Sequence, residues 1–256
     1  MSFKEKMAEA ARKRESNIVL ALDLHYEKPE NRQTLYKRAE NIVEAVSPYI
    51  CAVKFNHHLI LPLGVFNGVQ KLLEKTHKEG LLAIMDCKVN DIGSTNQVIA
   101  EYYYEAGFDA LIANPFVGWE EGLKPVFEVA KNRRKGVILL AYMSHKGAEE
   151  GYGQMVVDAE SEKKKPQYVV FAEKALKWNA DGVVVGATYP EKVREVYTVL
   201  GGKIPIYSPG VGAQGGEIES ALKAGASYLI VGRAITLSEN PAETAKRIRD
   251  TAMGIK

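Results

Sequence analysis

One stretch of sequence decides the fold: LLAIMDCKVNDIGSTNQVIAEYYYEAGFDALIA, residues 81–113. It opens with an apolar run (81–86), continues through a helix-like segment (94–106) and Gly107, and closes with a second apolar run (109–113). Glycine just past a helical segment is typical of a helix C-cap. Because the runs are too apolar for strands with one solvent-exposed face, we expect two parallel strands that are buried on both faces and joined by a helix.

The same unit repeats along the chain. Apolar, β-branched runs predict eight strands, at residues 17–23, 50–55, 81–86, 109–113, 136–142, 181–186, 204–208 and 227–232. Helix-like segments between them include residues 33–46, 64–78, 94–106, 119–131 and 167–178. Strict β–α alternation over about 240 residues predicts an α/β protein with one closed (β/α)8 barrel, a TIM barrel. The alternative is an open doubly wound sheet, which usually has a Gly-rich loop after its first strand. Here that strand runs into ALDLHYEKPE, without glycine.

No linker divides the sequence, so residues 1–256 are expected to form a single catalytic barrel domain with a short N-terminal helix at about residues 3–14. The longest stretch without periodicity, residues 144–165, follows the fifth strand. Long loops inside compact domains are often lids. Trp119 and Trp178 sit in helical patterns and are expected to pack between helices and the barrel.

Composition and charge exclude several classes of protein. With 46% apolar and 26% charged residues, the chain has the balance of a soluble globular protein rather than a disordered one. A formal net charge of +2 gives no sign of nucleic-acid or membrane-surface binding. No run approaches the roughly 20 apolar residues that span a bilayer. The charged start, MSFKEKMAEAARKRES, lacks the apolar stretch of a signal peptide, so a cytoplasmic location is expected.

Charged side chains stand at the carboxyl ends of predicted strands, where barrel enzymes carry out their chemistry. Asp23 ends the first strand and Lys54 lies at the end of the second. The third runs into DCKVND, in which Asp86 and Lys88 should face the same side because strand side chains alternate. Asp91 is expected to begin the following helix. A lysine between carboxylates is favoured in its charged form, which indicates a proton donor rather than a Schiff-base nucleophile. A structural ion-pair network is the alternative.

A second signal is GVGAQGG (residues 210–216) after the seventh strand, followed by VGR (231–233) at the eighth. Backbone N–H groups of such a turn can hold a phosphate, and Arg233 can clamp it bidentately. The alternative is a flexible turn beside a surface arginine. Because the two parts stand at adjacent strand ends, a phosphate site is favoured. The histidines lack metal-ligand spacing, so no metal site is predicted.

These motifs together resemble the orotidine 5′-phosphate decarboxylase family. The resemblance runs from Val19 to Ala245 and rests on ALD, VKFN, DCKVNDI, YMSHKGA, SPGVGAQGG and VGRAI. The DxKxxD pattern is shared by a wider group of barrels, whereas SPGVGAQGG with VGR is much more specific. The resemblance implies conversion of orotidine 5′-phosphate to UMP and carbon dioxide in pyrimidine biosynthesis, with neither a metal nor an organic cofactor.

The resemblance also implies roles for individual residues. Lys88 would protonate C6 of the pyrimidine, while Asp86 would lie against the substrate carboxylate and orient Lys88. Asp91, Ile92 and Thr95 would reach into the neighbouring subunit's site, so that a homodimer shares its active sites. Asp23 and Lys54 would hold the ribose hydroxyls, Ser144 the pyrimidine edge, and Gln214 and Arg233 the phosphate. Further substrate-binding residues implied are Met143, Pro209, Val211 and Gly232.

Three other functions stay open. A sugar-phosphate decarboxylase or hexulose-phosphate synthase of the same barrel group also carries DxKxxD, but it uses magnesium, which Lys54 would repel. A Schiff-base aldolase is disfavoured by the carboxylates that flank Lys88. A catalytically inactive nucleotide-binding barrel is the third, although nothing obvious is missing from the set of site residues.

Overall fold

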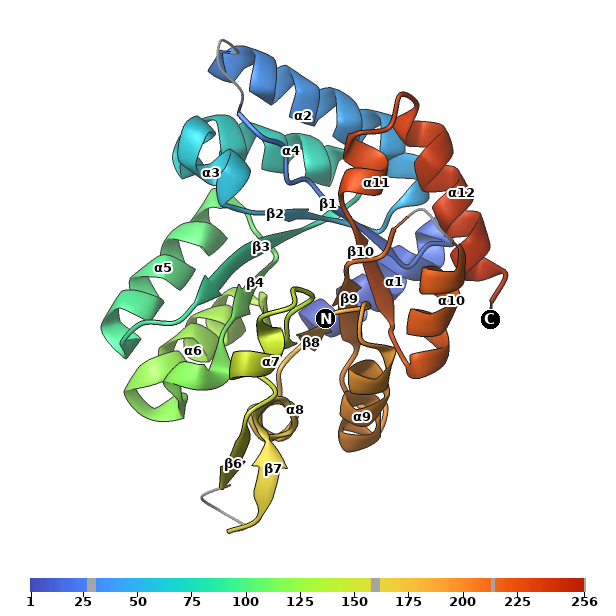
Figure 1. Cartoon of the computed structure of the whole chain (residues 1–256). Coiled ribbons are helices and arrows are strands. Elements are labelled where there is room, and N and C mark those ends of the chain that lie inside the picture. Colours follow the sequence, from blue (N-terminus) through green and yellow to red (C-terminus); the bar gives the residue numbers. More distant parts are fainter. Residues whose placement is uncertain (27–30, 158–161, 213–214, 256) are drawn as a thin grey trace.

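The computed structural model describes residues 1–26, 31–157, 162–212 and 215–255. Within them, eight parallel strands close into a barrel in the order β1-β10-β9-β8-β5-β4-β3-β2, and helices surround it (Figure 1). This confirms the predicted (β/α)8 barrel and excludes the open sheet. Because all the barrel strands are parallel, their carboxyl ends meet at one rim.

Each barrel strand overlaps one of the predicted apolar runs. Their bounds are β1 Ile18–Ala21, β2 Ala52–Phe55, β3 Leu82–Val89, β4 Ala110–Ala113, β5 Gly136–Tyr142, β8 Gly182–Val185, β9 Ile206–Pro209 and β10 Tyr228–Val231. Most of their side chains are buried, because alternate residues face the barrel interior and the surrounding helices. The largest difference is at β3, which continues past Asp86 to Val89.

The described helices are α1 Phe3–Arg14, α2 Arg32–Val46, α3 His57–Leu63, α4 Gln70–Lys78, α5 Gly93–Ala106, α6 Lys124–Arg133, α7 Ala148–Gly151, α8 Gln167–Lys177, α9 Pro190–Leu200, α10 Gly215–Ala224, α11 Arg233–Thr236 and α12 Pro241–Met253. Helix α1 closes the end of the barrel opposite the carboxyl-end rim, and its Phe3 and Met7 join the interior cluster. A Cβ at Gly136 would lie 2.4 Å from the Phe3 ring, so glycine at this position makes room for the Phe3 side chain. None of these helices combines the length and the apolar character that a membrane crossing requires.

Two predicted helices are interrupted. The segment predicted at 64–78 becomes helical only at α4, because Gly64 has φ 74° and Phe66 and Asn67 leave the helical region. The segment predicted at 119–131 likewise begins as a kinked turn, in which Glu121 is left-handed (φ 54°), before α6 starts. Apolar periodicity runs on through both turns, which is why the sequence pattern does not reveal them.

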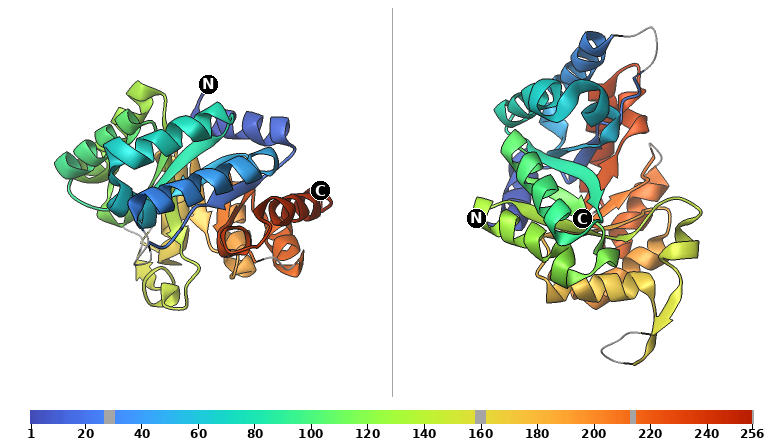
Figure 2. Two further views of the ribbon diagram at one scale, coloured as in Figure 1. Left: turned by 90° about the horizontal axis from the view of Figure 1, so that it is seen from above. Right: turned by 90° about the vertical axis from the view of Figure 1, so that its left-hand side faces the viewer.

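The long segment after β5 is not a structureless loop. It contains α7 and an antiparallel pair of short strands, β6 Met155–Val157 and β7 Lys164–Pro166. This hairpin projects away from the barrel, as Figures 1 and 2 show. In the part of this segment that the structure describes, Ser144 and His145 line the cavity at the barrel mouth and the hairpin strands do not, so the described strands do not lie where a lid would.

Candidate active site

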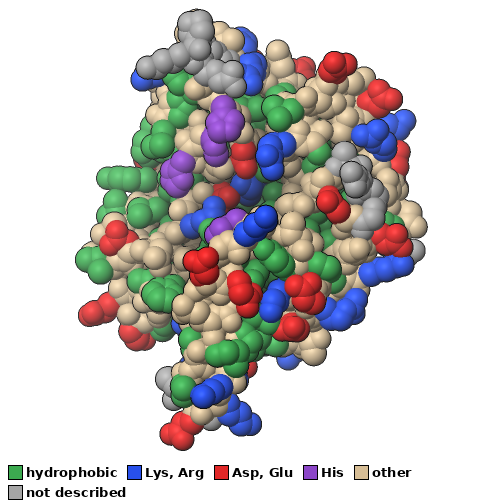
Figure 3. All heavy atoms as spheres, viewed as in Figure 1, with side chains coloured by type: hydrophobic (Ala, Val, Ile, Leu, Met, Phe, Trp, Pro, Cys, Tyr) green, Lys and Arg blue, Asp and Glu red, His purple; other side chains and the backbone are tan. Residues whose placement is uncertain are grey.

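A cavity of about 610 Å³ opens at the carboxyl-end rim of the barrel. Figure 3 shows Lys, Arg, Asp, Glu and His side chains gathered around this hollow. The structure brings together most of the predicted site residues on its walls: Asp23, Lys54, Asp86, Lys88, Met143, Ser144, Pro209, Val211, Gly232 and Arg233. Gln214 lies outside the described residues.

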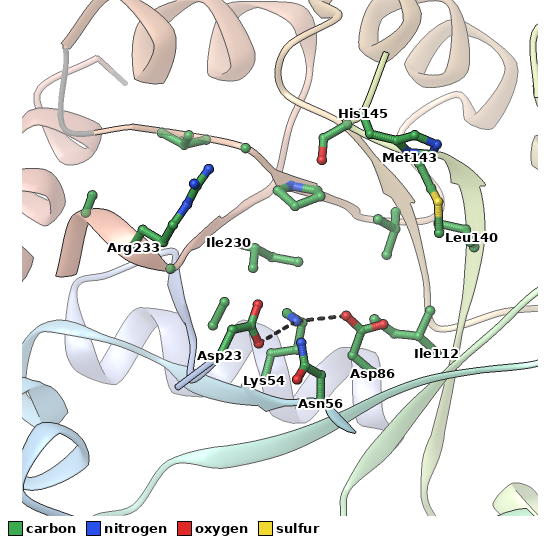
Figure 4. A pocket seen from close by; sticks show the side chains of 18 of the residues that line it. Asp23, Lys54, Asn56, Asp86, Ile112, Leu140, Met143, His145, Ile230 and Arg233 are labelled. Carbon is green, nitrogen blue, oxygen red and sulfur yellow. Dashed lines mark hydrogen bonds and ion pairs between the residues drawn. The ribbon is translucent and has the colours of Figure 1, made fainter. Parts of the chain in front are cut away.

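The carboxylate of Asp86 connects two lysines on the floor of the cavity. Its Oδ2 accepts a hydrogen bond from Lys54 Nζ at 2.8 Å, and its Oδ1 accepts one from Lys88 Nζ at 2.7 Å. Lys54 Nζ also donates to Oδ1 of Asp23 at 3.3 Å (Figure 4). The Lys54 side chain is only 6% exposed, whereas Lys88 is 38% exposed and reaches into the open cavity. The network therefore presents one lysine to a bound molecule and keeps the other beneath it.

The two buried members of this network hold each other in the charged state. Burial alone would lower the pKa of Lys54, but the Asp86 and Asp23 carboxylates outweigh burial and raise the pKa above its ordinary value. Burial would likewise raise the pKa of Asp86, but the Lys54 and Lys88 ammonium groups outweigh it and lower the pKa. Because the lowered pKa keeps Asp86 ionised, it is an acceptor rather than an acid at neutral pH.

Lys88 owes its position to an irregularity in β3. The pairing of β3 with β4 shifts register between Met85 and Val89, and Lys88 has φ 49°. Left-handed backbone at a non-glycine residue costs roughly 1–3 kcal/mol, and within a strand, away from helix ends and turns, it is the kind of strain that clusters at functional sites. Asp86 and Lys88 do share one side, as alternation predicts, but a β-bulge rather than a regular strand puts them there.

Arg233 faces the acid–lysine network from the other side of the cavity (Figure 4). It is the first residue of α11 and is exposed, and among the described residues no ion pair or side-chain hydrogen bond engages its guanidinium. Near it, the N–H of Gly212 donates to Oε2 of Glu217 at 2.6 Å. A guanidinium without a side-chain partner in the described part of the chain is suited to an anion with several oxygens, whereas the Gly212 N–H is already bonded to Glu217.

The segment Met143–His145 forms the wall at the end of β5. Thr188 Oγ1 donates to the Ser144 carbonyl at 3.1 Å, and the Tyr189 hydroxyl donates to the His145 carbonyl at 3.2 Å. A Cβ at Gly186 would lie 2.7 Å from Cα of Ser144, so the two strand-end segments are in close contact. These contacts fix the backbone of Ser144, and Ser144 lines the cavity.

Asp91, Ile92 and Thr95 do not line the cavity of their own chain. All three are exposed, and Ile92 is 64% exposed. Asp91 precedes α5, which begins at Gly93, so the expectation that Asp91 begins the helix is wrong by two residues. The buried side chain of Asn96 holds this turn: its Oδ1 accepts from the N–H of Asp91 at 3.0 Å and its Nδ2 donates to the Gly122 carbonyl.

Sequence reasoning missed Asn56, His145 and Glu217, which also line the cavity. Asn56 lies two positions after Lys54, so strand alternation could have found it. Its Oδ1 accepts the His58 N–H at 2.8 Å and caps α3. Nothing in the sequence marked Glu217 as a site residue, because an acidic residue in the first turn of a helix is common.

Among the described residues, no group of three or more His, Cys, Asp or Glu side chains could hold a metal ion.

Comparison with known proteins agrees with the resemblance found in the sequence. The orotidine 5′-phosphate decarboxylase of Thermococcus kodakarensis is 37% identical over 241 residues, 94% of this chain and 99% of that protein. The Pyrococcus horikoshii OT3 structure of that enzyme is 36% identical with a TM-score of 0.76, covering 92% of this chain and 98% of that one. The Methanocaldococcus jannaschii structure, complexed with the inhibitor BMP, is 33% identical with the same TM-score and coverage. The sequence pattern of one family matches residues 16–248. The chain therefore belongs to the orotidine 5′-phosphate decarboxylase / HUMPS family.

Proposed function

We propose that this protein decarboxylates orotidine 5′-phosphate to UMP and carbon dioxide in pyrimidine biosynthesis. The observation that carries the proposal is one cavity with Lys88 held 2.7 Å from Asp86 on its floor and, across from them, Arg233, whose guanidinium has no partner among the described residues. The first arrangement fits a reacting pyrimidine carbon, and the second fits a phosphate. The names of the relatives support the same reaction.

In the proposed reaction the bond between C6 of the pyrimidine and its carboxylate breaks, and the electron pair stays on C6. Carbon dioxide leaves, and the Lys88 ammonium transfers a proton to C6 to form the new C–H bond. Lys88 and Lys54 stabilise the developing negative charge because they are positioned before the reaction and need not reorganise. Asp86 orients Lys88 through their hydrogen bond and lies against the departing carboxylate.

The remaining residues are assigned to binding. Asp23 and Lys54 hold the ribose hydroxyls. Ser144 recognises the pyrimidine edge and Met143 packs against the ring. Arg233 and Gln214 bind the phosphate, together with their neighbours Pro209, Val211 and Gly232. Binding energy from the phosphate, far from C6, then contributes to the chemical step.

We propose that the reaction uses neither a metal nor an organic cofactor. Lys54 lies where a metal-dependent relative would need an acidic ligand, and a buried ammonium repels a cation. The Asp86 carboxylate has both oxygens hydrogen-bonded to lysines, and Asp23 also accepts from Lys54. These carboxylates are therefore committed to ammonium groups rather than available to a divalent ion.

A homodimer with shared sites is the proposed assembly, with Asp91, Ile92 and Thr95 reaching the partner's cavity. Large apolar side chains near them are exposed: Leu61 77%, Phe66 51%, Ile92 64%, Tyr102 55% and Phe116 71%. They come from α3, the turn before α4, the residue before α5, the second half of α5 and the segment after β4, and Figure 3 shows apolar side chains along this edge. Contiguous exposed apolar surface of this kind marks an interface.

We propose a cytoplasmic enzyme of one catalytic domain, without nucleic-acid or membrane partners.

The test is an ultraviolet assay of orotidine 5′-phosphate conversion to UMP in the presence of EDTA. Turnover that EDTA leaves unchanged supports the proposal. Activity on a hexulose phosphate that EDTA abolishes, without turnover of orotidine 5′-phosphate, would assign the chain to the metal-dependent branch of the family. Binding of UMP without turnover of either substrate would indicate an inactive nucleotide-binding barrel.

A further inference from the structure

A second cavity, of about 490 Å³, lies on the side of the barrel beside the ends of α6 and α8. Its walls include Trp119, Phe127, Lys131, Arg134 and Trp178, none of which lines the cavity at the barrel mouth. Its volume falls in the range of pockets that bind small molecules. Nothing in the proposed decarboxylation uses it.

Three aromatic rings form one wall of this cavity. The Trp119 and Trp178 rings lie 5.2 Å apart at 32°, and Phe127 lies 5.2 Å from Trp119. All three residues are only half-buried, whereas the aromatic residues that fill the core, such as Phe108 and Phe171, are at most 1% exposed. The two indoles therefore pack against each other and, being only half-buried, leave part of their ring surface exposed, although Lys174 Nζ lies 5.5 Å from the Trp178 ring. Planar bases stack on such surfaces with little regard to sequence.

Two cations stand beside the aromatic wall. Lys131 and Arg134, at the end of α6, are exposed, and neither side chain has an ion-pair or hydrogen-bond partner among the described residues. Their neighbour Lys135 differs, because it is paired with Asp109 at 3.0 Å. A planar guanidinium with an ammonium close by is a common way to bind a phosphate.

A carboxylate that has no partner among the described residues also lines the cavity. Asp181 is committed, since its oxygens accept the backbone N–H groups of Lys4 at 3.2 Å and Val137 at 3.1 Å. Glu128, one turn before Lys131 on α6, is exposed and has no such partner among the described residues. An ionised carboxylate only accepts hydrogen bonds, so it suits an amino group on a bound base.

We propose that this cavity binds a mononucleotide whose base carries an exocyclic amino group. The base stacks on the ring surface that the Trp119–Trp178 pair leaves exposed, the amino group donates to Glu128, and the phosphate lies on Lys131 and Arg134. The base preference of this cavity therefore differs from that of the barrel mouth, because uracil has no exocyclic amino group.

Intrinsic fluorescence gives a direct test, because the sequence contains two tryptophans and both line this cavity. The native protein is titrated with AMP, UMP, adenosine and inorganic phosphate while tryptophan emission is followed. AMP is expected to change the emission saturably and to bind at least about tenfold more tightly than the other three. The double variant Lys131→Gln/Arg134→Gln should weaken AMP binding at least about tenfold. Arg133→Gln, at the same helix end but outside the cavity, is the matched control and should bind AMP normally.

Other results would overturn the site. The proposal is wrong if AMP leaves tryptophan emission unchanged or if AMP and UMP bind equally well. It is also wrong if the AMP response disappears in Arg233→Ala, because the ligand would then lie at the barrel mouth. If the double variant is misfolded by circular dichroism, Glu128→Gln decides instead: it should remove the preference for AMP over UMP. Turnover of orotidine 5′-phosphate should be the same in Glu128→Gln and the native protein.

Discussion

Lys88 Nζ lies 2.7 Å from Oδ1 of Asp86, although the two residues are only two positions apart on β3 and the backbone at Lys88 is left-handed. In a regular strand, alternation would also place both side chains on the same side of the sheet. Here the pairing of β3 shifts register between Met85 and Val89, and the ammonium still meets the carboxylate. The strained backbone therefore stands where the proton donor is required, and the neighbouring strands hold it there.

Lys88→Ala should abolish measurable turnover while the protein stays folded. The lysine is proposed both to donate the proton to C6 and to stabilise the charge, and no second ammonium is equally exposed to the cavity floor in the described residues. Binding of UMP should survive better than activity, because the phosphate and ribose contacts remain. Steady-state kinetics with circular dichroism checks this. A variant that keeps more than about a tenth of the native kcat, a loss below roughly 1.4 kcal/mol, would contradict the proton-donor role.

Asp86→Asn should lower the free energy of unfolding by roughly 3 kcal/mol at neutral pH, because it leaves the buried Lys54 ammonium poorly compensated. Since the folded-state pKa of Asp86 is lowered, its stabilising contribution is fully present above the unfolded-state value of about 3.9 and is lost as pH falls below it. Urea unfolding at fixed protein concentration, from pH 7 down to pH 3, measures the difference between the variant and the native protein. The difference should be constant above about pH 5 and shrink below about pH 4.

The control for that series is Asp23→Asn, because Asp23 is 34% exposed and lies 3.3 Å from Lys54. At neutral pH it should cost less stability than Asp86→Asn. If Asp86→Asn were as stable as the native protein, or if the difference did not change on acidification, the electrostatic account of the network would be wrong.

Much of this architecture could be predicted from sequence, because a strand buried on both faces must be apolar along its whole length. The run at 136–142 matches β5 for this reason. The charged ends of the first three strands were also visible, since Asp23, Lys54 and Asp86 each interrupt an apolar pattern. Their convergence then follows from the parallel barrel.

Other features depend on contacts that a local pattern does not contain. The β6–β7 hairpin includes Lys164 and Pro166, which are unusual in strands, and its pairing is decided by the partner strand. The left-handed backbone of Lys88 could not be predicted either, because a regular strand and the observed bulge both place its side chain on the same side as that of Asp86. Asn96 looks like an ordinary helix residue, yet it is fully buried and bonded to the carbonyl of Gly122, 26 positions away.

Subunit mixing tests the proposed shared site. Lys88→Ala and Asp91→Ala proteins should each be inactive, but a heterodimer of the two contains one site with neither lesion. After equal mixing and random exchange, about a quarter of all sites should be intact, so activity should return to about that level. Exchange is verified with two differently tagged chains. If activity stays absent although heterodimers have formed, Asp91 does not act across the interface.

Arg233→Ala should separate phosphate binding from chemistry. Arg233 begins α11 and reaches the cavity from the side opposite Asp86 and Lys88, so it should not approach C6 (Figure 4). The substitution removes a bidentate, charge-assisted contact to the phosphate dianion. We expect kcat/KM for orotidine 5′-phosphate to fall by about 100-fold or more, since each 1.4 kcal/mol is tenfold. Orotidine lacks the phosphate and offers Arg233 nothing to hold, so its already low kcat/KM should barely change. The comparison of both substrates in both proteins is the measurement. Equal losses on the two substrates would mean that Arg233 supports the fold or the chemical step directly, and the phosphate assignment would be wrong.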